Sequence, residues 1–176
     1  IRDILGQAVD AALPDEQIDE IKMGTTVATN ALLERKGDRT LLVVTRGFRD
    51  QLRIAYQARP RLFDQHIVLP EMLYERIEEV SERVDANDNI LVPLDLDDLA
   101  PRLQAAFDDG IRSIAIVLMH GYRVPAHEQK IAALAKRIGF SQISTSHDTS
   151  PMIKFVGRGN TTVADAYLSP ILRRYI

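Results

Sequence analysis

The sequence predicts an α/β fold in which a parallel or mixed sheet is flanked by helices. Helical stripes of apolar residues alternate with short, uninterrupted apolar runs in the second half of the chain. This alternation is typical of βαβ units with right-handed crossovers. The chain has 176 residues, a length that suits one domain with a hydrophobic core.

The first part of the chain alternates helical and extended patterns that are bounded by proline and glycine. The run RTLLVVT is apolar and β-branched, which indicates a buried strand. The predicted elements, in order, are a helix over 1–13 that ends near Pro14, an extended segment over 18–24, a helix over 26–35 with Gly37 in the usual C-terminal position, a strand over 39–45 and a short helix over 47–55.

Residues 58–72 hold two prolines and show no clear period, so a loop is predicted there. The segment that follows is ambiguous. Apolar residues between Leu73 and Val84 have helical spacing, whereas RVDANDNILVPL resembles two strands joined by an Asp/Asn turn. We favour the second interpretation, a β-hairpin around residues 86–89.

The second half has clearer signals, because glycine follows two of its helical stripes and proline precedes one of them. The predicted elements, in order, are a helix from Leu96 to Phe107 that stops at Gly110, a buried strand over 111–119, a helix that begins at Pro125 and stops at Gly139, a strand over 141–147, and a last helix from about residue 161 that Pro170 breaks or kinks.

Composition argues against several functions. The net charge of −3 at pH 7 does not favour a nucleic-acid surface. The chain has no cysteine, so disulfides and cysteine zinc sites are absent, which fits a cytoplasmic protein. No apolar run has the length of a membrane span, and no signal peptide is visible. The four histidines match no compact metal motif, so no metal site is predicted.

Both ends of the chain fall inside helical patterns rather than in polar linkers. Domain boundaries usually fall in polar linkers. We therefore expect residues 1–176 to form a single α/β domain that is a fragment of a longer polypeptide.

Polar residues follow the predicted strands, and ligands of α/β sheets gather at the carboxyl ends of strands. Arg46, His120 and His147 follow the first, second and third of the strong strands, so they are possible cleft residues. The alternative is structural: a lone histidine is more often structural than ligating, and most of the five arginines between residues 46 and 61 suit a solvated face.

Two stretches, MGTTVATNALLERKG and RGNTTVADAYL, share a glycine followed by Thr-Thr-Val-Ala, and each pair is predicted to open a helix. Threonine capping is the favoured interpretation on spacing alone. The sharper interpretation is an anion site made by hydroxyls and free backbone amides. The candidate substrate- or phosphate-binding residues are Thr25, Thr26, Asn30, Arg158, Thr161 and Thr162. Phosphate-loop, dinucleotide and serine-elbow motifs are all missing.

Five stretches together resemble the amino-terminal region of the hydantoinase A / 5-oxoprolinase family. They are MGTTVATNALLERKGDRTLLVVTRGFRDQLRI (23–54), ERVDANDNIL (82–91), IAIVLMHGYRVPAHE (114–128), STSHDTSP (144–151) and RGNTTVADAYLSPILRRY (158–175). The resemblance implies part of an actin-like ATPase (ribonuclease H-like) architecture.

The resemblance also implies an ATP-dependent enzyme that opens a small cyclic amide, a hydantoin or 5-oxoproline. ATP would phosphorylate the lactam or imide oxygen, and water would then open the ring. The full-length protein is expected to use ATP and Mg²⁺ and to include a carboxyl-terminal lobe of the same chain. A hydantoinase B-type subunit is one possible partner. The fragment alone is expected to bind no cofactor and to be inactive.

The chain departs from the family pattern in two places. It lacks the Gly-Gly-Thr-Phe-Thr-Asp turn with which members usually begin, and it has Gly157-Arg158 where many carry Glu-Arg. Two alternatives stay open. One is a carboxylase subunit that phosphorylates a ketone enol and bicarbonate. The other is a non-catalytic assembly module whose helices at 1–13 and 161–176 pack on another lobe or partner.

Overall fold

The computed structural model describes residues 24–57, 63, 65–66 and 68–175. The helix predicted over 1–13 lies outside the described residues, as does nearly all of the extended segment over 18–24. Of the loop predicted over 58–72, the described residues include 68–72, which are irregular and so agree with it.

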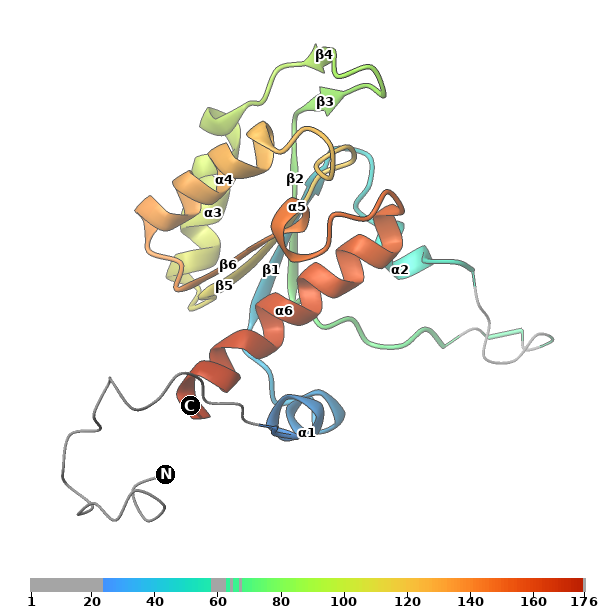
Figure 1. Ribbon diagram of the computed structural model, residues 1–176, viewed down its shortest axis with the longest axis vertical. Coiled ribbons are helices and arrows are strands. Elements are labelled where there is room, and N and C mark those ends of the chain that lie inside the picture. The colour runs from blue at the N-terminus through green and yellow to red at the C-terminus, as the bar shows by residue number, and fades with distance from the viewer. Residues whose placement is uncertain (1–23, 58–62, 64, 67, 176) are drawn as a thin grey trace, which may run out of the picture.

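A four-stranded sheet forms the centre of the molecule, with the strand order β2-β1-β5-β6 (Figure 1). All three strand pairs are parallel. The strands are β1 Thr40–Thr45, β2 Arg76–Val80, β5 Ser113–Val117 and β6 Gln142–Thr145. The sheet confirms the predicted parallel α/β fold, and β1, β5 and β6 fall where strands were predicted.

Helices cover both faces of the sheet. The helices are α1 Val27–Leu33, α2 Gln51–Ile54, α3 Leu96–Asp108, α4 Ala126–Ile138, α5 Ser146–Thr149 and α6 Phe155–Tyr175. The helices α3 and α4 lie on one face, and the long α6 crosses the other (Figure 1). No helix in the described part of the chain is long and apolar enough to span a membrane.

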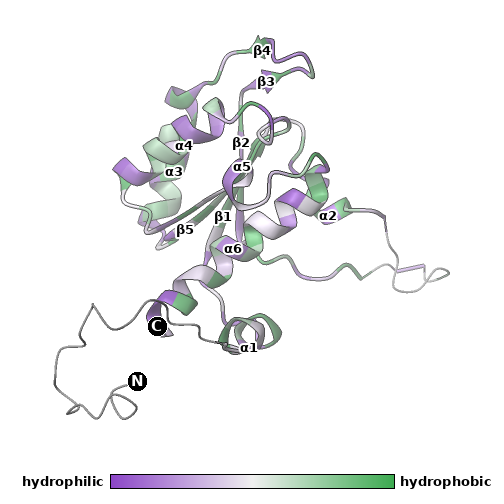
Figure 2. Cartoon of the chain, viewed as in Figure 1, coloured by the Kyte–Doolittle hydropathy of each residue, from purple (hydrophilic) through white to green (hydrophobic). Residues whose placement is uncertain are grey.

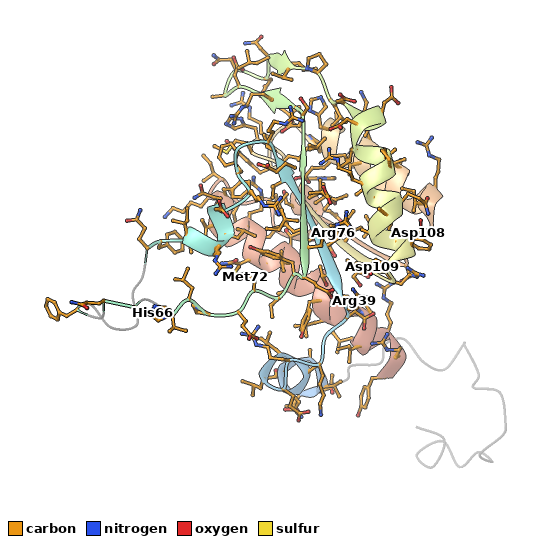
Figure 3. All side chains as sticks on the ribbon, turned by 180° about the vertical axis from the view of Figure 1, so that it is seen from behind. Arg39, His66, Met72, Arg76, Asp108 and Asp109 are labelled. Carbon is orange, nitrogen blue, oxygen red and sulfur yellow. The ribbon has the colours of Figure 1, made fainter. Side chains whose placement is uncertain are left out.

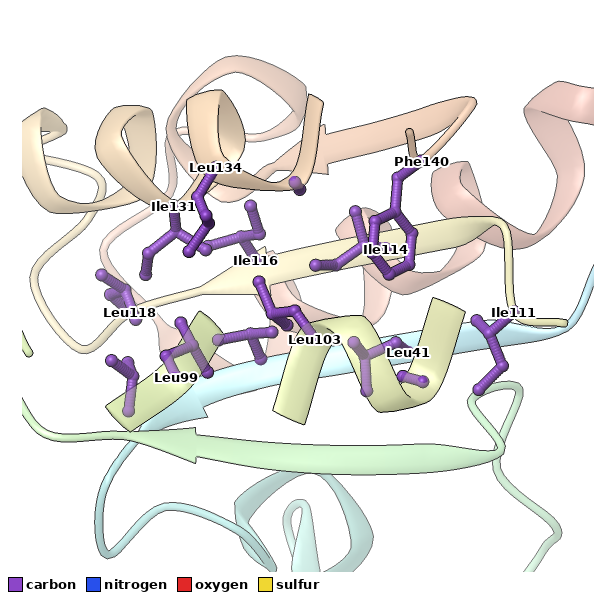
Figure 4. Packing of buried hydrophobic residues seen from close by; sticks show 14 residues of the cluster. Leu41, Leu99, Leu103, Ile111, Ile114, Ile116, Leu118, Ile131, Leu134 and Phe140 are labelled. Carbon is purple, nitrogen blue, oxygen red and sulfur yellow. The ribbon is translucent and has the colours of Figure 1, made fainter. Parts of the chain in front are cut away.

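The two central strands, β1 and β5, are buried along their whole length because both faces are covered. Alternate side chains point to opposite faces. Leu41 and Ile114 pack under α3 and α4 in the larger apolar cluster (Figure 4). Leu42 and Ala115 belong to the second cluster, beneath α6. In Figure 2 the apolar colour lies on the sheet and on the helix sides that face it.

The strand β2 was not predicted as part of the main sheet. Its sequence RIEEV has two carboxylates, yet it pairs with β1 from Leu41 opposite Arg76 to Thr45 opposite Val80. An edge strand tolerates such charge when its polar side chains find partners. Glu78 is buried, and it accepts hydrogen bonds from Arg76 (2.9 Å) and from Arg102 of α3 (3.0 Å).

The predicted hairpin is confirmed, as β3 Arg83–Val84 pairs with β4 Ile90–Val92 in an antiparallel ladder. The Asp85 side chain makes the turn, because its Oδ1 accepts from the backbone N–H groups of Asn87 (2.8 Å) and Asn89 (2.9 Å). The helical alternative for residues 73–84 is therefore wrong.

An ion cluster closes the amino-terminal end of the sheet. Arg39 donates to both carboxylate oxygens of Glu75 (2.7 and 2.6 Å) and to Asp109 Oδ2 (2.9 Å). Arg39 and Asp109 lie close together in Figure 3. The Glu75 partner holds the pKa of Arg39 above its usual range, and Arg39 holds the pKa of Glu75 below its own. The cluster is solvent-exposed, so its contribution to stability is small.

One predicted helix end is corrected, and another is confirmed. The helix α1 ends at Leu33, and Arg35 takes the left-handed conformation that was assigned to Gly37. Gly37 instead packs on the ring of Tyr167, where a side chain would have no room. The prediction for Gly139 holds, since this residue has φ of +114° at the end of α4.

The last helix is also corrected. It begins at Phe155, not near residue 161, and it continues through Pro170 to Tyr175. The beginning of α6 contains Gly157 and Gly159. Glycine serves close packing here, since a Cβ on Gly159 would lie 2.6 Å from Leu52 of α2. Pro170 deprives the helix of a single N–H donor, which packing of α6 on the sheet can offset.

Candidate functional site

The carboxyl ends of β1 and β5 form a topological switch point. These strands are neighbours, yet their connections leave on opposite faces: α2 packs Leu52 into the cluster beneath α6, while α4 packs Ile131 into the other cluster. Open α/β sheets bind ligands in the crevice at such a point. We call this region the carboxyl edge and define it as residues 45–47, 118–122 and 146–148.

Arg158 is buried against the carboxyl edge, with an exposed fraction of 0%. Its Nε donates to Ser146 Oγ (2.9 Å). Its Nη2 donates to the carbonyl oxygens of Leu118 (2.6 Å) and Met119 (3.0 Å), and its Nη1 donates to those of Met152 (2.7 Å) and Ile153 (3.3 Å). All five N–H donors of the guanidinium are thereby used.

Glu128 is the matching buried anion, also with an exposed fraction of 0%. Its carboxylate accepts from the backbone N–H of Leu118 (2.9 Å), the Ser146 hydroxyl (2.6 Å), and the backbone N–H (3.0 Å) and Nδ1 (2.7 Å) of His147. A Cβ on Gly121 would lie 2.2 Å from Glu128 Oε1, so this glycine makes room for the carboxylate.

Ser146 joins these two charges, because its hydroxyl donates to Glu128 and accepts from Arg158. We call the set Glu128, Ser146, His147, Arg158 and the backbone of 118–119 the Glu128–Arg158 network. Burial lowers the pKa of Arg158 from its ordinary value, and the nearby charge of Glu128 opposes that shift. Arginine remains protonated at neutral pH in any case. The network ties the ends of β5 and β6 to α4 and α6.

A second buried network lies beside the first. The Thr45 hydroxyl accepts from the backbone N–H of Met119 (3.0 Å) and donates to Glu82. The other oxygen of Glu82 meets Nδ1 of His127 at 2.9 Å, and both side chains are buried. This network joins β1 and β5 at the switch point to the segment that follows β2 and to α4.

The two predicted cleft histidines, His120 and His147, are each held by a hydrogen bond at Nδ1. Nδ1 of His120 lies 2.6 Å from the carbonyl oxygen of Val84, and Nδ1 of His147 lies 2.7 Å from Glu128. An acceptor at Nδ1 favours the tautomer with hydrogen on that atom. Nε2 of each neutral ring is then a hydrogen-bond acceptor. Both residues are only partly buried.

Arg46, the third predicted cleft residue, is exposed at the end of β1 and lies 3.7 Å from Asp98 of α3. The next residue, Gly47, has φ of +91°, and its backbone N–H donates to Glu79 at 2.7 Å. The structure therefore places Arg46, His120 and His147 at the ends of strands, as the sequence predicted, and it brings Arg158 of α6 to the same carboxyl edge.

The first threonine pair lies elsewhere. Thr25 and Thr26 precede α1, which sits at the amino-terminal end of β1 beside the last turns of α6 (Figure 1). Thr26 occupies the N-cap position but makes no side-chain cap; instead the Val27 N–H donates to Thr25 Oγ1 at 3.2 Å. Thr25, Thr26 and Asn30 are all exposed.

The second threonine pair does not open a helix. Thr161 and Thr162 lie inside α6, where their hydroxyls donate to the carbonyl oxygens of Gly157 (3.0 Å) and Arg158 (2.8 Å). Their backbone amides belong to the helix, so the predicted turn with free amides is wrong. Thr162 is buried and Thr161 is exposed.

Sequence reasoning missed the acidic members of both networks. Neither Glu128 nor Glu82 was among the predicted site residues. Their partners come from distant segments: Thr45 is 37 residues from Glu82, and Ser146 is 18 residues from Glu128. A local signal was Gly121, a glycine two residues after the end of the strand predicted over 111–119.

A parallel sheet with helices on both faces defines an α/β domain, and polar side chains gather at its switch point. The profile of one family, described as the hydantoinase/oxoprolinase N-terminal region, matches residues 1–139. The chain belongs to this family, as the resemblance predicted.

Relatives with named activities agree with this membership. The chain is 43% identical to 5-oxoprolinase 1 of Arabidopsis thaliana, in a match that covers 93% of the chain. It is 40% identical to 5-oxoprolinase of Dictyostelium discoideum, in a match that covers 100% of the chain. It is 33% identical over 94% of its length to the acetophenone carboxylase gamma subunit of Aromatoleum aromaticum. The chain spans only 14%, 16% and 25% of these relatives.

A solved structure shows the same fold. The ATP-dependent caprolactamase of Pseudomonas jessenii matches 86% of this chain with a TM-score of 0.77 and 29% identity, and the match covers 23% of the caprolactamase chain.

Proposed function

We propose that this chain is the amino-terminal region of an ATP-dependent enzyme that opens a cyclic amide ring. The observation behind the proposal is the 43% identity to a 5-oxoprolinase across nearly the whole chain. The fold supports it, because the structural relative is named an ATP-dependent caprolactamase, and caprolactam is also a cyclic amide.

We assign different roles to the residues of the carboxyl edge. Arg158 has no donor left for a ligand, so we assign it a positioning role, holding the ends of β5 and β6. His120 and His147 present Nε2 as an acceptor, and each could take a hydrogen bond from the ring N–H of the substrate or from the attacking water. Arg46 is exposed and suits an anionic group.

The threonines predicted to bind an anion divide into two groups. Thr25, Thr26 and Asn30 are exposed, and we keep them as candidate contacts to an anionic ligand. Thr161 and Thr162 donate within α6, so we propose that they act through the packing of that helix.

ATP would supply the phosphoryl group that activates the amide oxygen. Among the described residues, no group of three or more His, Asp or Glu side chains is placed to hold a metal ion, and the chain spans only 14% of the 5-oxoprolinase of A. thaliana. We therefore propose that the nucleotide and Mg²⁺ are bound mainly by other parts of the full-length protein.

The test is an assay of the full-length protein with ATP and 5-oxoproline, hydantoin or ε-caprolactam. We expect phosphate release that depends on one of these rings, together with the ring-opened product. His147→Gln is expected to lower kcat by about 10²-fold if the ring moves a proton. His66→Gln, at an exposed position away from the sheet (Figure 3), is the matched control. Absence of ring opening with all three substrates would reject the proposal.

A second candidate function is ATP-dependent ketone carboxylation. The observation that favours it is the 33% identity to an acetophenone carboxylase subunit over 94% of the chain. In this case the protein would work with partner subunits. Phosphate release that requires both bicarbonate and a ketone would distinguish it from ring opening.

A further inference from the structure

We propose that a cavity between α2 and the segment that leads into β2 binds the carboxylate of a small molecule. We call it the Tyr74 cavity; its volume is about 520 Å³. Arg49 and Arg53 line it from the side of α2, and residues of the segment 69–77 line it from the other side. One of these residues, Met72, lies beside α2 in Figure 3. No residue of the carboxyl edge lines the cavity, so it is separate from the candidate site described above.

Tyr74 holds a buried hydroxyl that lacks a partner. The side chain is 9% exposed, and its ring belongs to the apolar cluster beneath α6, together with Leu42 and Leu52. Its hydroxyl is out of contact with water and has no hydrogen-bond partner among the described residues. A buried polar group without a partner is costly, so folded proteins nearly always provide one. An acceptor on a ligand in the cavity would provide it here.

The groups around this hydroxyl favour an acceptor with negative charge. Burial raises the pKa of Tyr74, while the positive charges of Arg53 and Arg49 oppose the shift and the negative charge of Asp50 adds to it. The phenol is therefore a protonated donor at neutral pH, and guanidinium groups are donors only. A carboxylate can accept from several such donors at once through its two oxygens.

Both arginines can be reached from solvent, because their side chains are exposed. The hydrogen bond that Arg49 makes to the described residues is a long one, 3.4 Å from Nη1 to the carbonyl oxygen of Ile77. Exposed side chains change rotamer on a timescale of nanoseconds or less. The arginines can thus turn towards an entering carboxylate and open a path to the covered hydroxyl of Tyr74.

The other charges in the wall decide which anion fits. Glu75 and Arg76 are already held in ion pairs of 2.6 and 2.8 Å. Asp50 and Glu71 also line the cavity, and their two negative charges balance the positive charges of the two arginines. Like charges repel, so this balance disfavours a multiply charged phosphate. It admits a carboxylate that carries a single charge.

The test measures binding to the full-length protein by isothermal titration calorimetry. The probes are butyrate and inorganic phosphate, used at constant ionic strength because salt screens exposed charges. We expect saturable binding of butyrate and weaker binding of phosphate. Tyr74→Phe removes only the hydroxyl and should raise the Kd for butyrate about 10-fold, the effect of one lost hydrogen bond to a charged group. Arg137→Gln, at an exposed position on α4, is the control and should leave the Kd unchanged.

A second measurement is the stability of Tyr74→Phe without any probe. We expect it to equal that of the unmodified protein, since the deleted hydroxyl has no partner there. A loss of stability would show that another part of the full-length protein already bonds to the hydroxyl, and it would overturn the proposal. The same holds for equal Kd values in Tyr74→Phe and the unmodified protein, for absence of saturable butyrate binding, and for tighter binding of phosphate. None of these measurements depends on ring opening or ATP turnover.

Discussion

At the scale of single residues, the buried charges of Glu128 and Arg158 are the most consequential groups in the structure. They do not touch each other directly; the Ser146 hydroxyl lies between them. Each also forms a hydrogen bond with the backbone at the end of β5. Glu128 accepts from the N–H of Leu118, and Arg158 donates to the carbonyl oxygen of Leu118. Removing one charge would leave the other buried without compensation.

Glu128→Gln is therefore expected to destabilise the protein by about 3 kcal/mol, the cost of breaking a buried charge pair. The amide keeps the shape of the side chain, but its NH₂ group would replace one oxygen and face either the donors of Leu118 and Ser146 or those of His147. Equilibrium urea unfolding measures the loss. Glu34→Gln, an exposed side chain that pairs with Lys36, should change stability by less than about 0.5 kcal/mol. Equal losses in both variants would contradict this account.

At the scale of secondary-structure elements, the hairpin turn depends on one carboxylate. Bonds from the side chain and backbone N–H of Asn89, and from the backbone N–H of Asn87, lower the pKa of Asp85. Because the pKa of Asp85 is lower in the folded protein, its carboxylate stabilises the hairpin at pH values above about 3.9, the pKa of aspartate in the unfolded chain. This stabilisation is lost as the pH falls through the lower pKa of the folded state.

We expect the amides of Asn87 and Asn89 to stay protected near neutral pH and to lose protection well below pH ~4. In Asp85→Ala the same amides should exchange faster already at neutral pH, because the acceptor is gone. Hydrogen exchange read by NMR or mass spectrometry checks both expectations. Asp97→Ala is the control, at an exposed position in the first turn of α3. Unchanged protection in Asp85→Ala would show that the strand pairing alone holds the turn.

The elements that could be predicted from the sequence are those with a strong local signal. The runs at 39–45 and 111–119 are apolar because β1 and β5 are covered on both faces. The edge strand β2 gave no such signal, since it contains charged residues, and Glu78 is paired with Arg76 of β2 itself and with Arg102 of α3. The start of α6 was hidden by glycines whose role is packing against α2.

The candidate site was likewise predictable only where its residues follow a strand with a strong local signal. Arg46, His120 and His147 follow strands, so their place at the carboxyl edge could be inferred from order alone. The donors around Glu128 and the acceptors around Arg158 could not be inferred from the sequence, because they come from segments up to 40 residues away. The threonine pairs look alike in sequence, but one precedes a helix and the other lies inside one.

At the scale of the whole molecule, the sheet separates two apolar clusters that differ in side-chain size. The cluster under α3 and α4 is rich in leucine and isoleucine, while the contact between β5 and α6 is made with Ala115, Val163 and Ala166. Small side chains allow α6 to lie close to the sheet.

Ala115→Leu is expected to destabilise the protein by about 2 kcal/mol, because extra methylene groups would force α6 away from β5. Ile116→Val, on the opposite face of the same strand, should cost about 1 kcal/mol through a small cavity. Thermal unfolding of the two variants ranks them. If Ala115→Leu were neutral or stabilising, the contact between α6 and the sheet would have to be looser than the structure shows.

The position of Arg158 late in the chain has a consequence for folding during synthesis on the ribosome. Glu128 and the end of β5 emerge some 30 to 40 residues before the guanidinium that compensates them, as the separations of 39 and 40 residues for Met119 and Leu118 show. We expect the nascent sheet to stay open at its carboxyl edge until α6 leaves the exit tunnel. Protease resistance of chains stalled before and after Arg158 emerges would reveal this step, and equal resistance at both lengths would exclude it.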